Sequence, residues 1–244
     1  MRTIRIHIDA PLAEGDALAL PEQAGEHVAR VLRLGVGDAL VLFNGDGRDY
    51  PARIAALARR EVRVEVGAAQ AVEKESPLRL TLAQGIARGE KMDLILQKAT
   101  ELGVARIVPL LTERSEVRLD GERAGKRIAH WQAVIASACE QCGRARLPEL
   151  LPLQALRGWL DGLADDGALR LTLLPDGTRQ ARALRPGPAG AVLAIGPEGG
   201  LGERDIAMLR AAGFDGLRLG PRILRTETAG LAALAALQAL HGDL

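Results

Sequence analysis

The segment "AVLAIGPEGGLGERD", residues 191–205, joins an apolar run to a polar, helix-like stretch through four glycines. The apolar run predicts a buried strand, and a helix is expected to begin near Glu203. Glycines let the backbone approach a ligand closely, and exposed N–H groups at a helix N-terminus favour an anionic group. The glycine spacing matches neither the dinucleotide fingerprint nor the P-loop, and a tight structural turn is the alternative interpretation.

The same alternation of strand and helix continues on both sides of this segment, from Pro77 to the C-terminus. Strands are predicted at 78–87, 105–111, 168–174, 191–195 and 216–220, and helices at 90–103, 121–142, 151–163, 203–213 and 231–240. This pattern predicts an α/β fold with a mostly parallel sheet covered on both faces. Ligands in such folds bind beyond the carboxyl ends of the strands, which directs attention to three loops: "LLPDG", "IGPEGGLGE" and "LGPRILRTETAG".

The loop "LGPRILRTETAG", residues 219–230, is more polar than a strand-to-helix connection requires. A threonine N-cap and a Glu227 carboxylate that complements the helix dipole would account for part of it. Capping does not explain Arg225 or the apolar pair Ile223 and Leu224, which could wall a flat hydrophobic ligand. Ligand binding and a capped helix start are equal alternatives for this loop on its chemistry.

The N-terminal part of the chain has a different texture. Short alternating segments, "RTIRIHI", "DALVLFN", "YPARIAAL" and "EVRVEV", are separated by turn signals and predict a small antiparallel sheet or barrel. A short helix is expected within "EHVARVLRLGVGD". The small, charged stretch 67–77, which proline closes, is typical of a linker. We therefore place domains at 1–70 and 78–244, with 71–77 as the linker.

Composition limits the possible functions. The chain of 244 residues is 48% hydrophobic, which suffices for one large core or two unequal ones. It shows no apolar run near the roughly 20 residues of a membrane span and no apolar signal-peptide core, so a cytoplasmic location without a membrane is expected. With a net charge of +1 and 2% aromatic residues, nucleic-acid binding would depend on local arginine patches and not on stacking against rings.

The two cysteines, Cys139 and Cys142, form "CEQC" in a helix-like stretch. Without a second pair or a nearby histidine they cannot supply four zinc ligands, and no metal is predicted. Ordinary thiols in a reducing compartment are the expected state, and a redox pair is the alternative.

Five motifs, "EKMDLILQKATELGV", "IVPLLTERSEV", "SACEQCGRARLPEL", "IGPEGGLGERDI" and "LGPRILRTETAGLAAL", together resemble the bacterial 16S ribosomal RNA uridine-N3 methyltransferases of the knotted SPOUT superfamily. "HVARVLRLGVGD" resembles their N-terminal PUA-like domain, and the likeness spans nearly the whole chain. It implies a trefoil-knotted C-terminal domain, an exception to the unknotted rule, and a small PUA-like β-barrel. It also implies S-adenosylmethionine as methyl donor, 16S rRNA as substrate within the 30S subunit, and a homodimer. The last helix, apolar on nearly every side, suits such a partner.

The resemblance assigns cofactor binding to the three loops. The residues are Leu173, Leu174, Pro175, Gly196, Pro197, Glu198, Gly199, Gly200, Leu219, Gly220, Ile223, Leu224, Arg225 and Thr226. Methylation at uracil N3 requires loss of a weakly acidic imide proton or stabilisation of the imide anion. Arg225 is ranked first for catalysis and Glu198 second, with Glu227 as a further candidate base. Glu198 could instead orient the cofactor, and Glu227 could cap the helix.

RNA contacts are expected from arginines and from the end of the long helix. The predicted phosphate contacts are Arg5, Arg30 and Arg33 and a second group of Arg114, Arg118, Arg123, Lys126 and Arg127. At the helix end, Glu140, Gln141 and Arg144 are expected to face the cofactor or the target nucleotide. Guanidinium groups suit phosphate contacts, but a surface ion pair or a solvated helix end is the alternative for each.

Three other functions compete with this one. A related enzyme could act on a different RNA, a non-catalytic RNA-binding protein would need no cofactor loops, and a nucleotide-dependent dehydrogenase would need a ribose-binding acid after the next strand. No acid is suitably placed for the last. The sequence leaves open whether naked rRNA or the assembled 30S subunit is the substrate.

Overall fold

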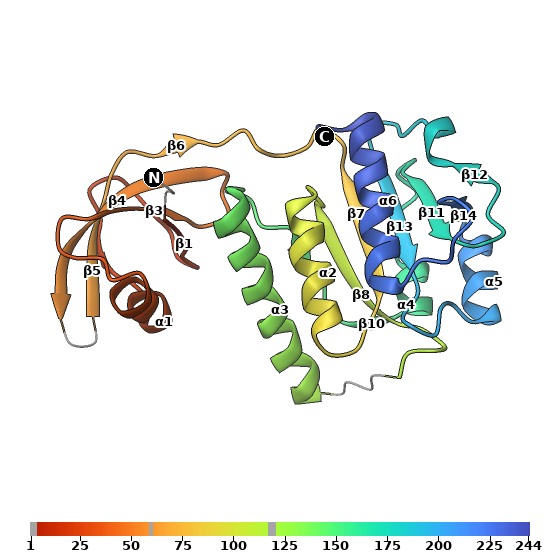
Figure 1. Ribbon diagram of the computed structural model, residues 1–244, viewed down its shortest axis with the longest axis horizontal. Helices are drawn as coiled ribbons and strands as arrows, with labels where there is room; N and C mark the ends of the chain where they lie inside the picture. The colour runs from red at the N-terminus through yellow and green to blue at the C-terminus, as the bar shows by residue number, and fades with distance from the viewer. Residues whose placement is uncertain (1–3, 59–60, 117–120) are drawn as a thin grey trace. The chain divides into compact units, whose positions relative to one another are not determined.

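The computed structural model describes residues 4–58, 61–116 and 121–244, and Figure 1 labels most of its helices and strands. The chain divides into two compact units, one formed by 1–75 with 139–147 and the other by 76–138 with 148–244. The first division falls within the predicted linker 71–77. The return of 139–147 to the first unit was not anticipated, because the motif "CEQCGR" was placed in the second domain.

The first unit is built on a small sheet. Its strands are β1 (Arg5–His7), β2 (Ala17–Ala19), β3 (Ala39–Phe43), β4 (Arg48–Ala58), β5 (Glu61–Val66) and β6 (Gln70–Ala71). The order is β1-β3-β4-β5-β2, with β6 beside β4; β1 and β3 are parallel and the other pairs antiparallel. The alternation is plain in β5, where every second side chain is buried. The four predicted strands are confirmed within the described residues.

A short helical segment covers part of this sheet's core. It consists of α1 (Glu22–Glu26) and a π-helical turn, η1 (His27–Val31), in which Val28 is fully buried. The predicted helix is therefore present, but it begins and ends earlier than its hydrophobic pattern indicated.

The second unit contains a larger sheet with the order β10-β8-β7-β13-β11-β14-β12, and β9 pairs with β8. Its strands are β7 (Leu80–Gly85), β8 (Arg106–Leu111), β9 (Glu149–Leu150), β10 (Gln154–Ala155), β11 (Leu169–Leu173), β12 (Arg179–Gln180), β13 (Ala191–Ile195) and β14 (Asp215–Arg218). Every strand pair of this sheet in the described residues is parallel. All five residues of β13 are buried, as expected for a central parallel strand. The predicted parallel sheet is confirmed.

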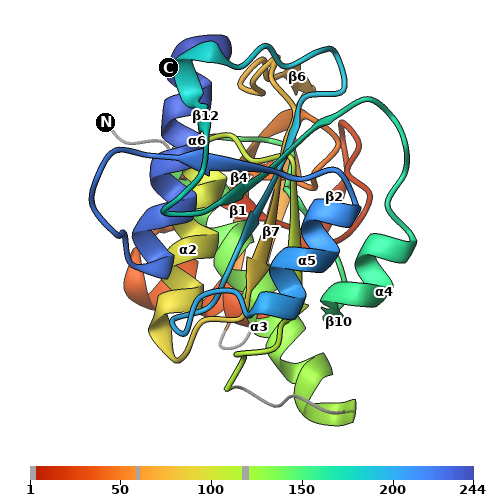
Figure 2. The same ribbon diagram turned by 90° about the vertical axis from the view of Figure 1, so that its right-hand side faces the viewer.

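Helices cover both faces of this sheet, as Figure 2 shows. The helices α2 (Glu90–Glu101) and α6 (Thr226–His241) lie on one face, and α4 (Leu156–Asp161) and α5 (Glu203–Ala211) lie on the other. A 3-10 turn, η2, covers Ala181–Ala183, and the long α3 covers Gly121–Cys142. The helix predicted at 151–163 begins only at Leu156, because Gln154 and Ala155 pair with β8. Within the described ranges, no helix is both long and apolar enough to cross a membrane.

Candidate functional site

A cavity of about 500 Å³ lies at the carboxyl ends of the adjacent strands β13, β11 and β14. The loops that follow these strands are the three that the sequence singled out. Every residue predicted to bind the cofactor lines this cavity: Leu173, Leu174, Pro175, Gly196, Pro197, Glu198, Gly199, Gly200, Leu219, Gly220, Ile223, Leu224, Arg225 and Thr226. Residues more than 50 positions apart therefore meet because parallel strands end at one edge.

The glycine loop folds back on itself after β13. A Cβ atom at Gly196 would lie 2.7 Å from the carbonyl carbon of Gly200, so a larger residue cannot occupy this position without a backbone shift. Gly200 itself has a positive φ of 71° and donates its N–H to the carbonyl of Pro197 at 2.8 Å. The glycines are thus required by the path of the loop, and they keep its backbone accessible from the cavity.

A buried polar contact ties this loop to α6. The Thr226 hydroxyl donates to the Gly196 carbonyl at 2.6 Å and accepts from the Gln84 side-chain amide at 3.0 Å. Gln84 is fully buried on β7 and also donates to the Gly85 carbonyl at 2.9 Å. Sequence analysis did not single out Gln84, although a lone amide in the apolar run "LRLTLAQG" was the available signal.

Glu198 fixes the other side of the glycine loop. Its carboxylate accepts a hydrogen bond from the Arg88 main-chain N–H at 3.0 Å and lies 3.3 Å from the Lys91 ammonium group. Partial burial raises the pKa of Glu198, but the hydrogen bonds and the positive charge of Lys91 outweigh it and hold the pKa below its ordinary value. A carboxylate with a lowered pKa is a weak proton acceptor, so the geometry favours a loop-fixing role for Glu198.

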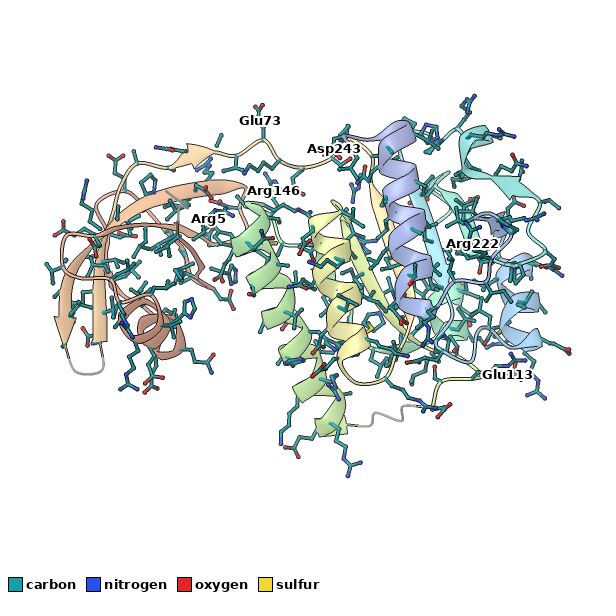
Figure 3. The ribbon with its side chains drawn as sticks, in the orientation of Figure 1. Arg5, Glu73, Glu113, Arg146, Arg222 and Asp243 are labelled. Atoms are coloured by element: carbon teal, nitrogen blue, oxygen red, sulfur yellow. The ribbon has the colours of Figure 1, made fainter. Side chains whose placement is uncertain are left out.

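The loop that follows β8, residues 112–116, also lines the cavity, through Arg114. The Arg114 guanidinium donates to the Gly199 carbonyl at 3.0 Å. The buried Asp205 carboxylate accepts from the main-chain N–H groups of Gly202 at 3.0 Å and Glu113 at 3.1 Å. Figure 3 labels Glu113 on this loop and Arg222 on the loop before α6. Arg114 was predicted to contact RNA. Asp205 was missed: its bond to Gly202 is a local capping contact that the sequence could have indicated, whereas its bond to Glu113 joins residues 92 positions apart.

Positive charge surrounds the cavity. The arginines that line it are Arg114, Arg218, Arg222 and Arg225, and Glu198 is the acid among the described lining residues. This balance favours an anionic ligand.

Arg225 occupies the N-cap position of α6, where its carbonyl accepts from the N–H groups of Thr228 and Ala229. Its guanidinium is exposed and has no hydrogen bond or ion pair with any residue in the described ranges. Glu227, the further candidate base, is half-buried and does not line the cavity. One of its carboxylate oxygens is shielded from solvent with no partner among the described residues.

In the first unit, two predicted RNA contacts are engaged internally. The Arg5 guanidinium, seen in Figure 3, pairs with Asp49 at 2.5 Å, donates to the Cys139 carbonyl at 2.8 Å and lies over the Phe43 ring. Arg144 pairs with Glu75 at 2.5 Å and keeps only 5% of its side-chain exposure. Their phosphate contact stays an untested prediction, but these side chains already stabilise the unit that contains them.

The other predicted residues of this unit differ in exposure. Glu140 accepts from the His7 main-chain N–H at 2.9 Å, and burial raises the pKa of its carboxyl group despite that bond. Arg30, Arg33 and Gln141 are exposed, and Arg30 pairs with Glu26 at 2.9 Å.

In the second unit, Arg123 and Lys126 are exposed on α3 and Arg127 is half-buried there, whereas Arg118 lies outside the described residues.

The cysteine pair has no metal-binding or disulfide geometry. Both thiols are free, and no group of histidine, cysteine or acidic residues in the described ranges could hold a metal ion. Burial raises the pKa of the Cys139 thiol to about 12, so it is protonated at neutral pH. The expectation of ordinary thiols agrees with this geometry.

Comparison with known proteins gives consistent results for both parts of the chain. Residues 74–238 match a model of the RNA methyltransferase domain, and residues 20–67 match a model of the RNA methyltransferase PUA domain. A protein of Buchnera aphidicola named ribosomal RNA small subunit methyltransferase E is 32% identical over 100% of this chain and 98% of its own length. The protein of that name in Bacillus subtilis is 28% identical over 95% of each chain.

Two solved structures are similar over essentially their full length. One is a putative methyltransferase of Legionella pneumophila with bound S-adenosylmethionine, with a TM-score of 0.95, 42% identity and 100% coverage of both chains. The other is ribosomal RNA small subunit methyltransferase E of Neisseria gonorrhoeae, bound to S-adenosylmethionine, with a TM-score of 0.93, 41% identity and 99% coverage of both.

Proposed function

The chain belongs to the RNA methyltransferase family, and on this premise we propose that it transfers a methyl group from S-adenosylmethionine to N3 of one uridine in 16S rRNA. It is a small-subunit ribosomal RNA methyltransferase that uses this methyl donor. The choice of uridine N3 rests on the resemblance of its motifs. The observation that carries the proposal is the cavity at the carboxyl edge of the parallel sheet, where all the predicted loop residues meet.

The residues that line this cavity fit S-adenosylmethionine. Leu173, Leu174 and Ile223 offer apolar surface for a flat heterocycle, and Ile223 is 86% exposed beside the cavity, which is unusual for a large aliphatic side chain. Gly220 has a positive φ of 75°, so the backbone can turn and approach a ligand there. The four arginines that line the cavity, which we call the arginine rim, suit the carboxylate of the methionine part of S-adenosylmethionine. When bound, S-adenosylmethionine supplies an electrophilic methyl group on a positively charged sulfur.

Arg225 is the residue that we assign to the acceptor base. Uracil N3 becomes nucleophilic as its imide proton leaves, and negative charge then develops on the ring. A guanidinium at the N-terminus of α6 adds its charge to the positive end of the helix dipole, and both stabilise that anion. Because the Arg225 main chain is fixed by two hydrogen bonds while its side chain is unengaged among the described residues, the guanidinium is available for this role.

Glu198 keeps the glycine loop in the conformation that shapes the cavity. Its hydrogen bond from Arg88 and its ion pair with Lys91 join that loop to the start of α2. These contacts commit the Glu198 carboxylate to the loop, and its lowered pKa makes it a weaker base than an ordinary carboxylate, so we assign it to shaping the loop and not to accepting the N3 proton.

RNA binding would use the exposed arginines of both units and the arginine rim of the cavity. Arg30 and Arg33 in the first unit, and Arg114 and Arg222 in the second, are exposed enough to contact phosphates. The target base would have to leave its stack to reach a methyl group inside a cavity.

A homodimer and a trefoil knot belong to the same proposal. The helix α6 keeps a half-exposed apolar face at Leu231, Ala232, Ala235 and Ala236, and Leu240 is 48% exposed. A second copy of the chain would cover such a face, and light scattering of the purified protein would measure whether its mass is that of a dimer. A cytoplasmic location is proposed on the nature of the substrate.

The decisive experiment is methyl transfer from labelled S-adenosylmethionine to 30S subunits that lack the modification, with naked 16S rRNA in parallel. Mass spectrometry of the nucleosides would locate the methyl group. We expect a single N3-methyluridine. Methylation of a ribose oxygen, or of another base, would contradict the proposed uridine N3 specificity but not the assignment of the chain to the RNA methyltransferase family.

The variant Arg225→Ala tests the catalytic assignment. It should slow methyl transfer far more than it weakens S-adenosylmethionine binding measured by calorimetry, because its role is to stabilise charge on the acceptor base. Arg210→Ala is a matched control, since Arg210 is an exposed arginine of the same unit outside the cavity. Equal losses of rate and affinity in Arg225→Ala would make Arg225 a cofactor-binding residue.

A further inference from the structure

A second cavity, of about 540 Å³, lies at the opposite edge of the large sheet, where the strands begin. Its floor includes a row of cross-strand neighbours: Arg106 of β8 pairs in register with Thr81 of β7, Thr81 with Val192 of β13, and Val192 with Arg170 of β11. Neighbours paired in register on parallel strands point to the same face of a sheet, so these side chains form one line. With strands about 4.8 Å apart, the two arginines lie roughly 14 Å from each other along the row.

Three guanidinium groups face this cavity. Arg79 lies two residues before Thr81, on the same face of the chain, and lines the cavity with Arg106 and Arg170. The Arg79 side chain is exposed, and no residue in the described ranges pairs with it. Arg106 pairs with Glu149 at 2.8 Å, in an exposed ion pair that contributes little stability and can be exchanged for a ligand.

Arg170 is the fixed member of the three. It donates to the Ala212 carbonyl at 2.8 Å and the Ala164 carbonyl at 2.7 Å, and its side chain is only 19% exposed. A guanidinium that is already held loses little side-chain entropy when a ligand binds. Its ion pair with Asp165 is long, at 3.7 Å, and Asp165 is fully exposed.

The remaining charge of the cavity is small. Asp166 is the acid among the described lining residues, and its carboxylate accepts from the Ala168 main-chain N–H at 3.0 Å. The neutral donors Thr81 and Gln154 complete the polar surface. Glu149 and Asp165 lie outside the lining but offset part of the charge of Arg106 and Arg170, so Arg79, unpaired among the described residues, and the exchangeable exposed pairs are what favour an anion.

Apolar side chains also line this cavity. Trp159 of α4 lines the cavity, is 6% exposed and packs against Phe214 with ring centroids 5.9 Å apart. Leu163, just after α4, adds to this apolar lining. A cavity of this volume lined by both apolar and cationic side chains fits a ligand that joins a flat, weakly polar part to a phosphate.

We propose that this cavity binds a phosphate-bearing ligand of mononucleotide size, whose phosphate is held by Arg79 and Arg106, while Arg170 contributes positive charge at the other end of the row. The ligand can be a free nucleotide or a nucleotide within an RNA chain. The site is distinct from the methyl-transfer cavity because the two lie at opposite ends of the same strands.

Tryptophan fluorescence provides a local measurement. The chain contains two tryptophans, and Trp131→Phe leaves Trp159 as the reporter. The full-length variant would be titrated in phosphate-free buffer with inorganic phosphate, uridine 5′-monophosphate, uridine and a short RNA oligonucleotide without terminal phosphates. We expect a saturable change with the monophosphate, a weaker one with inorganic phosphate and none with uridine. Displacement of the monophosphate by the oligonucleotide identifies RNA as the source of the ligand, and no displacement identifies a free nucleotide.

The arginines are tested by the double variant Arg79→Ala with Arg106→Ala. Loss of two charge-assisted contacts should weaken monophosphate binding by roughly tenfold or more. Arg157→Ala is the matched control, because Arg157 lies on α4 with its side chain 80% exposed and does not line the cavity. Calorimetry on the chain with both tryptophans repeats the measurement if Trp131→Phe is unstable.

Unchanged monophosphate affinity in the double variant, or no saturable binding by either method, would overturn the proposal. S-adenosylmethionine binding, measured on the same samples, should be unaffected by the double variant. That second measurement separates a failure of this site from misfolding and from a failure of the proposed function.

Discussion

The hydrogen bond between Thr226 and Gly196 makes a quantitative test of how the cofactor cavity is held. In Thr226→Val, the side chain keeps its shape but the Gly196 carbonyl loses its 2.6 Å donor. Gln84 lies 3.4 Å from that carbonyl and can replace the lost donor only weakly, while it keeps its own 2.9 Å bond to the Gly85 carbonyl. One buried carbonyl is therefore left poorly paired, which costs about 1 to 2 kcal/mol.

This free energy should appear in thermal unfolding of the second unit. A change of 1 kcal/mol shifts the melting temperature of a unit of this size by about 2 to 4 °C, so Thr226→Val should melt about 2 to 8 °C lower. Because the lost bond shapes the glycine loop, S-adenosylmethionine affinity measured by calorimetry should fall several-fold as well. Thr226→Ser keeps the hydroxyl and should restore most of both quantities.

A double-mutant cycle with Gln84→Leu isolates the contact between the two side chains. Because they share a hydrogen bond, their effects should be non-additive by at least about 0.5 kcal/mol. Additive effects, or a Thr226→Val protein that melts and binds like the parent, would refute the role given to this contact. A Thr226→Ser protein as impaired as Thr226→Val would show that the hydroxyl is not the cause.

Three other outcomes follow from individual side chains. The pKa of Glu198 is lower in the folded protein, so its charged form stabilises the fold above the ordinary pKa of 4.5. This stabilisation is lost as the pH falls through the lower pKa of the folded state. The melting temperatures of the parent and Glu198→Gln should therefore become equal in acid. Iodoacetamide at pH 8 should label the half-buried Cys142 while leaving the buried Cys139 thiol unmodified until the protein unfolds, and mass spectrometry would locate the label. Arg5→Ala should lower the free energy of unfolding of the first unit by about 2 to 3 kcal/mol in a urea titration. The loss is smaller than for a fully buried pair because the carboxylate partner of Arg5 is 21% exposed. Arg30→Ala, in an exposed pair, should change this free energy little.

The strands that periodicity predicted are those long enough to show it. In β5 and β13 the burial pattern and the residue pattern agree position by position, alternating in one and continuous in the other. Strands such as β9, β10 and β12 have two residues each, and their pairing depends on neighbours that are distant in sequence. No local pattern of that length can indicate a strand, and the late start of α4 has the same origin.

The cofactor loops were predictable because one topological rule brings them together. Once the strands are parallel, residues after β11, β13 and β14 must share an edge, whatever their distance in sequence. The residues that hold those loops in place were not predictable in the same way. Gln84 lies near the Gly196 carbonyl and Asp205 accepts from the Glu113 N–H, and both partners are distant in sequence and become neighbours only in the folded chain.

The arginines show most directly what sequence cannot predict, because every arginine has the same side chain and only its partners in the folded protein differ. Arg5 and Arg144 are nearly buried, and each is held by a carboxylate and further contacts within the first unit. Arg225 and Arg79 are exposed and unpaired among the described residues, at opposite edges of one sheet. A guanidinium in a nearly buried ion pair must lose those bonds before it contacts a phosphate, whereas an exposed pair such as that of Arg106 with Glu149 exchanges readily, so the burial of its internal partners decides whether it can bind a ligand. The near-zero net charge of the chain therefore does not argue against two cationic sites, because the local electrostatic potential at a site depends on the unpaired charges there and not on the total charge of the chain.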